Sequence, residues 1–282
     1  MAFPTGWNRK CSIVIQSSKV PADLSNFPVL LTEDCLPSEM LDKDGSYPAL
    51  EGGADIRFTS DTEGVTPLHR EVVSCVLDND PSNATAEIWV NVPVVDHDAN
   101  TTIYVWYNNA SATEPDPDDA DHGRHGVWDS NYKTVLHMIG ATATDIDDST
   151  SNNNDVSGEN GTPTYNQAGQ IKQCIGCNGA DSEYIYLSSA GGLNNLQTGT
   201  ISLWVQWSGT QDQGHGDAYG GLTSRQKSGT FSNQIISLNG SDPDSAVITW
   251  RCYGADTKNI IGATLLIVIV SESLALCVEA FS

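Results

Sequence analysis

Oxygen-bearing side chains are concentrated in one polar stretch of the chain, where they could bind a calcium ion. They are Asp145, Asp147, Asp148, Asn152 and Asp155. Carboxylate and amide oxygens held together in a loop are the ligands that Ca²⁺ takes in proteins. The stretch is not an EF-hand, because Thr150 and Val156 stand where that motif needs glycine and its final glutamate. These residues are a candidate calcium site, and the alternative is a polar loop that only connects strands.

Aromatic side chains are the second candidate set, because a flat ring can cover the apolar face of a pyranose. Trp204 and Trp207 are three residues apart on a predicted strand, so they are expected to face opposite sides, one of them in the core. Tyr219 lies in the glycine-rich stretch GHGDAYGG and is expected to be exposed. Trp207 and Tyr219 are therefore the candidate ligand-binding residues. The remaining strand tryptophans are expected in the core: Trp89, Trp106 and Trp250.

Histidine and cysteine spacing gives little support for a transition-metal site. His122 and His125 could coordinate such a metal beside an aspartate, but no helix is predicted there, and a solvated loop is the preferred interpretation. Cys174 and Cys177 form one CxxC without a second pair at zinc-finger spacing, which favours a small disulfide loop or two buried thiols. His137 lies in an apolar run and is expected to be buried with hydrogen-bond partners.

Catalytic signatures are missing from the sequence. No predicted strand carries the Glu-x-Asp-x-x-Glu arrangement of glycosidases with a concanavalin-like fold, in which two carboxylates flank the scissile bond. The motifs GxSxG, HExxH and GxxxxGK[ST] are also missing. A non-enzymatic protein is therefore predicted. The alternative is a polysaccharide-active enzyme or an accessory domain of a glycoside hydrolase, because a Ser-His-Asp triad can assemble from distant segments.

The elements that must position these residues are predicted to be strands. Residues 86–92 alternate between apolar and polar side chains, and residues 102–107 are all β-branched or aromatic. Turn-forming residues 96–100 join the two segments, which predicts a hairpin-like unit. Further strands are predicted at residues 11–18, 27–31, 54–59, 68–76, 182–188, 199–207, 231–238, 245–253 and 260–270, with one helical turn at residues 38–41.

This pattern predicts an all-β fold of two antiparallel β-sandwich, jelly-roll-like domains in tandem. The Pro- and Asp-rich residues 114–121 are expected to be extended and solvated, which predicts domains at residues 1–126 and 127–282. No membrane span is predicted, because the apolar run at residues 260–270 is shorter than the roughly 20 residues that a membrane helix needs.

The charge balance excludes one class of partner. The chain has 36 acidic and 13 basic residues, a net charge of −23, whereas nucleic-acid binding needs clustered Lys and Arg. The chain is therefore expected not to bind nucleic acid.

The N-terminal residues lack an apolar segment after their charges, so no Sec signal peptide is expected.

The first 130 residues resemble the bacterial and phage family called domain of unknown function 2341. The resemblance is carried by Trp7 and, after it in order, the motifs FPVLL, ADIRFT, AEIWVNVP, TIYVWYNNA and VWDSNY. The later segments LHM, DSTSNNND, CIGCNGADSEYIYL and TISLWVQW resemble a laminin-G or concanavalin-A-like jelly roll. These resemblances imply a β-sandwich followed by a lectin-like β-sandwich. Residues 260–282 replace the final strands of such a jelly roll, so the second domain is expected to be truncated or to carry an atypical tail.

The resemblances imply a surface or virion structural protein of the phage tail-fibre or adhesin type, with carbohydrate binding for host or surface recognition. The expected partners are a glycan or cell-surface polysaccharide, other virion or surface proteins, and further copies of this chain in a homo-oligomer. The expected cofactor is calcium at the polar loop. The expected location is the virion or the cell surface.

Overall fold

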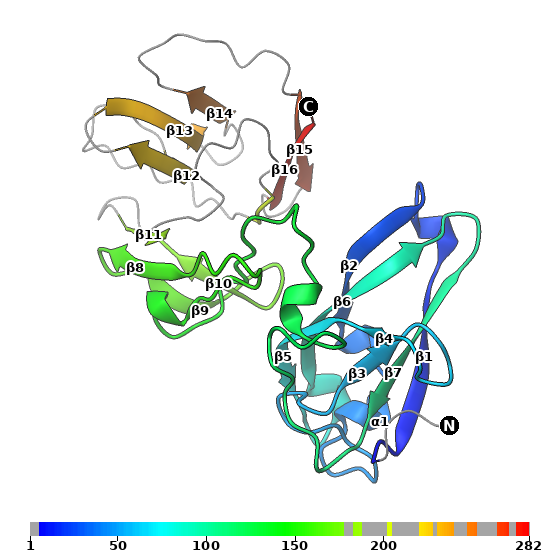
Figure 1. The fold of residues 1–282 in the computed structure, drawn as a ribbon. Coiled ribbons are helices and arrows are strands. Elements are labelled where there is room, and N and C mark those ends of the chain that lie inside the picture. The colour runs from blue at the N-terminus through cyan, green and yellow to red at the C-terminus, as the bar shows by residue number, and fades with distance from the viewer. Residues whose placement is uncertain are drawn as a thin grey trace. The chain divides into compact units, whose positions relative to one another are not determined.

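The computed structural model describes residues 6–177, 183–187 and 202–204, together with strands at residues 220–227, 230–239, 247–252, 264–270 and 275–281. Two compact units divide the chain: unit 1 comprises Met1–His137 and Ile146–Asp155, and unit 2 comprises Met138–Asp145 and Val156–Ser282. All paired strands described in both units are antiparallel, as Figure 1 shows, so the all-β fold class is confirmed. The sandwich and jelly-roll arrangements remain predictions.

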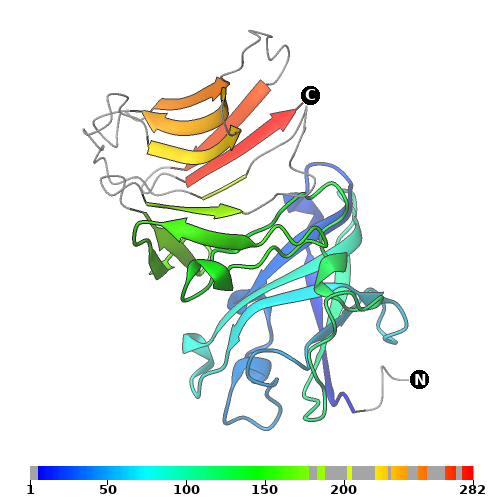
Figure 2. The same ribbon diagram turned by 60° about the vertical axis from the view of Figure 1, so that its left-hand side comes forward.

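The described part of unit 1 contains two sheets (Figure 2). One sheet has the strand order β1-β7-β3-β4, and the other has the order β2-β6-β5. The strands are β1 (Arg9–Ile15), β2 (Leu24–Thr32), β3 (Arg57–Thr59), β4 (Pro67–Leu68), β5 (Arg70–Val76), β6 (Thr85–Val95) and β7 (Thr101–Tyr107).

Short helical segments connect these strands. The predicted helical turn is confirmed as α1 (Ser38–Leu41), which buries Met40 and Leu41. The 3-10 segments in the described part of the chain are η1 (Ser17–Lys19), η2 (Glu33–Cys35), η3 (Pro81–Asn83), η4 (Arg124–Gly126) and, in unit 2, η5 (Ala143–Asp145).

Both sheets of unit 1 contribute to one hydrophobic core. Alternation along β6 directs Ile88, Val90 and Val92 to the same face, where their exposed fractions are 0–2%. Burying each of these side chains contributes about 1.5–3 kcal/mol relative to leaving it exposed. The same core includes Leu31 from β2, and Ile13, Phe58, Ile103 and Val105 from the other sheet.

The predicted hairpin-like pairing of residues 86–92 with residues 102–107 is wrong. Strand β6 pairs with β2 and β5, whereas β7 pairs with β1 and β3, so the chain crosses from one sheet to the other between them. Asp96 shapes this connection, since its Oδ1 accepts hydrogen bonds from the backbone N–H groups of Asp98 and Ala99. Turn-forming residues predict where the chain reverses but not which strands become neighbours.

The second face of β6 is also buried. Glu87 and Asn91, on the polar face of the alternating pattern, have exposed fractions of 2% and 8%. They are covered by residues 127–137 and 146–155, which we call the cap segment; the backbone carbonyl of Val127 accepts a hydrogen bond from Asn91 Nδ2 at 3.0 Å. The cap segment therefore belongs to the compact unit of the first seven strands. The division into two domains at residues 1–126 and 127–282 remains a prediction.

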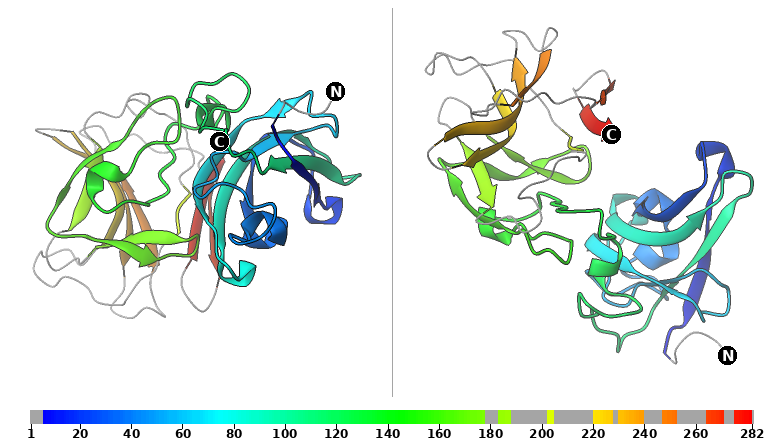
Figure 3. Two further views of the ribbon diagram at one scale, coloured as in Figure 1. Left: turned by 90° about the horizontal axis from the view of Figure 1, so that it is seen from below. Right: turned by 45° about the horizontal axis from the view of Figure 1, so that its top comes forward.

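Unit 2 is also built from antiparallel strand pairs in its described part. Strand β8 (Val156–Asn160) pairs with β11 (Tyr184–Leu187), and β9 (Thr164–Ala168) pairs with β10 (Gln173–Gly176). The remaining strands form a sheet of order β12-β13-β14 and a pair β15-β16 (Figure 3). Their bounds are Gly220–Lys227, Thr230–Asn239, Val247–Cys252, Thr264–Val270 and Ala275–Phe281.

The strands predicted near β11, β13, β14 and β15 are confirmed. Residues 202–204, inside the strand predicted at residues 199–207, form no strand, and the rest of that segment lies outside the described residues. In the described residues, we find no helix of the length and apolar character needed to cross a membrane.

Candidate functional site

Three titratable side chains meet beneath the cap segment, and we call them the buried triad. Glu71 projects from β5, Glu87 from β6 and His137 from the cap segment. His137 Nε2 lies 3.2 Å from Glu71 Oε2, and His137 Nδ1 lies 3.2 Å from Glu87 Oε1. The exposed fractions of the Glu71, Glu87 and His137 side chains are 7%, 2% and 13%.

Strand register explains why the two glutamates converge. Glu71 is directly opposite Trp89 in the β5–β6 pair, so their side chains share a face. Glu87 precedes Trp89 by two positions on β6 and therefore projects from that face as well. His137 reaches the glutamates because the cap segment lies across this face.

Hydrogen-bond donors reach both oxygens of Glu71 but only one oxygen of Glu87. Trp128 Nε1 donates to Glu71 Oε2 at 2.8 Å, and Ser149 Oγ donates to Glu71 Oε1 at 2.5 Å. Trp89 Nε1 donates to Glu87 Oε1 at 3.1 Å. The rings of Trp89 and Trp128 also pack together, with centroids 5.2 Å apart. The donors thus come from both the sheet and the cap segment.

The pKa values in the triad show which interactions dominate. Burial lowers the pKa of His137, but the hydrogen bonds and charges of Glu71 and Glu87 outweigh it and raise this pKa to about 9. Burial raises the pKa of Glu71, but the hydrogen bond and charge of His137, with the hydrogen bonds of Ser149 and Trp128, bring it below the usual 4.5. At neutral pH an imidazolium therefore bridges the two glutamates.

The hydroxyl of Ser149 lies beside the triad and donates to the Glu71 carboxylate rather than to the His137 imidazole. This is not the order of a Ser-His-Asp triad, in which the hydroxyl donates to the imidazole. All these side chains lie beneath or within the cap segment. The arrangement is suited to holding the cap segment on the sheet. The expectation that His137 is buried with hydrogen-bond partners is confirmed.

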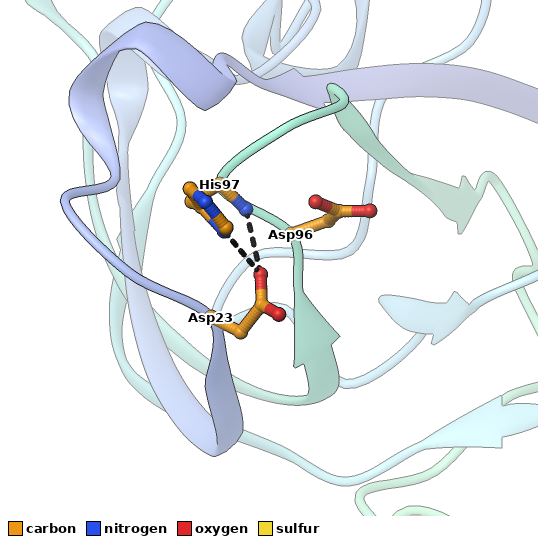
Figure 4. Close-up of side chains that lie close together, drawn as sticks. All are labelled: Asp23, Asp96 and His97. Atoms are coloured by element: carbon orange, nitrogen blue, oxygen red, sulfur yellow. Dashed lines mark hydrogen bonds and ion pairs between the residues drawn. The ribbon is translucent and has the colours of Figure 1, made fainter.

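A second group lies in the open, where the end of β6 meets the chain entering β2. Among the described residues, Asp23, Asp96 and His97 form the only group of three His, Cys, Asp or Glu residues whose potential metal-ligand atoms all lie within 4.8 Å. Asp23 Oδ1 accepts hydrogen bonds from the backbone N–H of His97 at 3.0 Å and from its Nδ1 at 2.7 Å (Figure 4). We call these three residues, with Asp98, the exposed cluster.

Imidazole and carboxylate ligands suit divalent transition metals, but these side chains already have partners. His97 Nε2 lies 3.2 Å from Asp98 Oδ1, and Asp96 Oδ1 accepts two backbone N–H groups of the turn. The carboxylate of Asp96 points away from the His97 ring in Figure 4. The hydrogen bonds from His97 lower the pKa of Asp23 below its usual value. These contacts hold together the two connections that precede β2 and β7.

Within unit 1, the residues predicted to bind calcium mostly bond to their own loop. Asp148 is fully buried, and its carboxylate accepts from the backbone N–H groups of Val135, Thr150 and Asn154. Asp155 Oδ1 accepts from the Asp148 N–H. Asn152 Nδ2 donates to the carbonyls of Tyr132 and Lys133, and Asp147 is exposed.

Asp145 belongs to unit 2, where its Oδ2 accepts from the backbone N–H groups of Ala141 and Thr142. All these contacts fit loops held by their own hydrogen bonds rather than a calcium cage. Calcium binding at these five residues remains a prediction.

The other candidate residues do not form a site in the described part of the chain. Trp207 and Tyr219 lie outside the described residues. His125 Nδ1 contacts Asp118 Oδ1 at 2.8 Å, and His122 is half-buried near the Leu68 carbonyl. Cys174 and Cys177 are free thiols, the first partly buried and the second exposed, so this structure shows neither the predicted disulfide loop nor the predicted pair of buried thiols.

Sequence reasoning missed Glu71 and Glu87. Glu87 was assigned to the polar face of an alternating strand, which is normally the face toward solvent. Trp89 on the same face was the available signal, because a large aromatic ring beside two polar residues suggests that the face is covered. The identity of the covering segment was not encoded in that local pattern.

Comparison with known proteins covers part of unit 1. The family model described as "Domain of unknown function (DUF2341)" matches residues 52–125, which include β3 to β7 and end before the cap segment. No curated protein and no solved structure matches the chain. The laminin-G or concanavalin-A-like resemblance of the second half remains a prediction. The strands from β3 to β7 are thus similar to the family of domain of unknown function 2341.

Proposed function

We propose that this chain is a non-enzymatic surface or virion structural protein of the phage tail-fibre or adhesin type, with carbohydrate binding for host or surface recognition. The observation that carries the proposal is the buried triad. In the described part of unit 1, its two carboxylates and its imidazole bond to one another and, with the hydroxyl of Ser149, secure the cap segment instead of facing a cleft. This use of polar residues supports a mechanical rather than a catalytic purpose.

Two further observations support the same proposal. Residues 52–125 match the model of domain of unknown function 2341. The ordered motifs of the chain resemble this family, and that resemblance implies a bacterial or phage surface protein. The net charge of −23 favours solubility and disfavours nucleic-acid or other polyanionic partners. A neutral glycan is compatible with this charge. Other virion or surface proteins, and further copies of the chain, are the proposed assembly partners.

A glycan-array screen of the purified chain tests the proposal, run once with calcium and once with EDTA. Binding to a defined glycan without release of reducing sugar is the expected result. Release of reducing sugar from a bound polysaccharide would instead establish the alternative, a polysaccharide-active enzyme. No binding to any glycan by a folded sample would remove the carbohydrate-recognition part of the proposal.

The same screen tests calcium. If the loop at residues 145–155 binds the ion, EDTA abolishes glycan binding, and the substitution Asp147→Asn weakens the calcium dependence. Asp147 suits this test because its side chain is exposed. Identical binding with calcium and with EDTA would contradict a calcium cofactor for this function.

A further inference from the structure

Two tyrosines of unit 2 lie side by side on an exposed strand face. Tyr184 and Tyr186 alternate along β11 with Ile185 and Leu187, so the two rings share one face and the two aliphatic side chains share the other. The tyrosines are 52% and 47% exposed, whereas the aliphatic side chains are partly buried. Large aromatic residues normally bury more of their surface, so this face is unusual for a structural strand.

A glycine of the neighbouring strand leaves space for one of the rings. Tyr186 is directly opposite Gly158 on β8. A Cβ atom at Gly158 would lie 2.5 Å from Tyr186 Oη and 2.7 Å from its Cζ, so the phenol end of the ring lies over the glycine backbone. Only glycine permits this position, because any side chain would displace the ring.

The two exposed rings do not stack on each other. Their centroids are 6.3 Å apart and their planes are tilted by 58°, so the rings meet at an angle rather than cover each other by stacking. The polar neighbour on this face is Asn160, which is directly opposite Tyr184 and is exposed. Its amide both donates and accepts hydrogen bonds, as do the two phenol groups.

We propose that Tyr184, Tyr186 and Asn160 form a binding platform for a neutral carbohydrate. This site rests on the proposed carbohydrate-binding function and places it on β8 and β11. The C–H face of a pyranose packs on the rings, while its hydroxyl groups bond to the amide and the phenols. The net charge of −23 disfavours an acidic polysaccharide, which makes a neutral hexose chain the expected occupant.

Glycan-array binding and titration calorimetry of variants test the platform. The double substitution Tyr184→Ala with Tyr186→Ala is expected to weaken binding of the selected glycan by about tenfold or more, because it removes both ring faces. The matched control, Tyr184→Phe with Tyr186→Phe, retains the rings and is expected to lose only about threefold from the phenol hydrogen bonds. Gly158→Val displaces the Tyr186 ring without deleting it and is expected to weaken binding as well.

The possible failures are distinguishable. If the natural chain binds a glycan and the double alanine variant binds it equally well, this site is overturned while the proposed function stands. If the natural chain binds no glycan, both this site and the carbohydrate-recognition part of the proposed function are overturned. Should the alanine variant not fold, the ring NMR signals of Tyr184 and Tyr186 in the natural chain decide: shifts on adding the glycan support the site, and unchanged signals overturn it.

Discussion

At two places in unit 1 a histidine lies between two carboxylates, and the two places differ in how deeply the histidine is buried. His137 contacts Glu71 and Glu87 with an exposed side-chain fraction of 13%. His97 contacts Asp23 and Asp98 with an exposed fraction of 42%. The groups are chemically alike, but the first lies beneath the cap segment and the second lies at a turn in water. Their energetic consequences are therefore expected to differ greatly.

The difference arises from solvation. Water screens the charges of the exposed cluster, so its ion pairs add little to stability. Beneath the cap segment, the attraction between His137 and the two glutamates is stronger, because less water screens it. Removing one partner also costs more, because an uncompensated charge would remain out of contact with water. The same residue types, when buried, thus stabilise the packing of two segments that are distant in sequence.

The largest effect is expected from His137→Phe, which leaves Glu71 and Glu87 buried without their cation. We expect the free energy of unfolding to fall by about 3–5 kcal/mol, measured by urea denaturation. Adding Glu71→Gln and Glu87→Gln to this variant is expected to restore part of the loss, since both buried charges are then removed. His97→Phe is the matched control in the exposed cluster. A loss for His137→Phe no larger than that of the control would contradict the comparison.

The second effect concerns pH. The pKa of His137 is raised from 6.5 to about 9 on folding. The contribution of protonated His137 to the free energy of unfolding is therefore fully present below pH 6.5 and is lost as the pH rises through 9. That contribution is on the order of 3 kcal/mol. The lowered pKa of Glu71 acts in the opposite direction: its contribution is present above pH 4.5 and is lost as the pH falls.

For the triad alone, the greatest stability is therefore expected between pH 4.5 and 6.5. Urea denaturation from pH 7.5 to 8.5 reports mainly on His137. At pH 7.5 the lowered pKa of His122 has little further effect, and the thiols of Cys75 and Cys177, whose pKa values are raised by burial, begin to contribute mainly near pH 9. Constant stability across the range would contradict a charged His137 in the folded chain.

A smaller effect is expected from Trp128→Phe, which removes the indole N–H that donates to Glu71. Trp106→Phe is a close control, because Trp106 is also buried and donates to the neutral Thr59 Oγ1 at 2.9 Å. A hydrogen bond to a charged group contributes about 1.5–3 kcal/mol and a neutral one about 1 kcal/mol. Thermal denaturation should therefore show a larger loss for Trp128→Phe, and equal losses would argue against an ionised Glu71.

The smallest effect is expected from His97→Ala in the exposed cluster. Because the partners Asp23 and Asp98 stay solvated after the substitution, the midpoint of thermal unfolding should not change measurably. The measurement is best made at low and at high salt, since screening should make even a slight difference vanish at high salt. A clear, salt-independent destabilisation would show that this cluster has a structural importance similar to that of the buried triad.

Much of the fold could be predicted from local patterns. Alternation and β-branched residues located β1, β5, β6 and β7, and the helical turn α1 was placed correctly. The burial of His137 was also predicted, because an apolar neighbourhood signals a covered position. The pairing of β6 with β7 was mispredicted, since closeness in sequence favours a hairpin while the observed partners are β2 and β5 for one strand and β1 and β3 for the other.

The site was less predictable than the fold. The acidic residues of the polar loop were the obvious ligand candidates by composition, yet Asp148 is fully used by backbone N–H groups of its own region. Glu71 and Glu87 were overlooked because a charged residue on an amphipathic strand normally faces water. The exposed tyrosines of β11 were not singled out, because exposure depends on what lies above a strand.

The sequence by itself determined the all-β character, the position of most strands and the acidic net charge, because these follow from the shape, period and charge of the side chains along the chain. Only the tertiary structure decided that β6 and β7 enter different sheets, that the cap segment covers β5 and β6, and that one histidine is buried between carboxylates while another is exposed. Strand pairing and burial depend on contacts between residues far apart in the chain. The free energy of a charged group depends in turn on that burial.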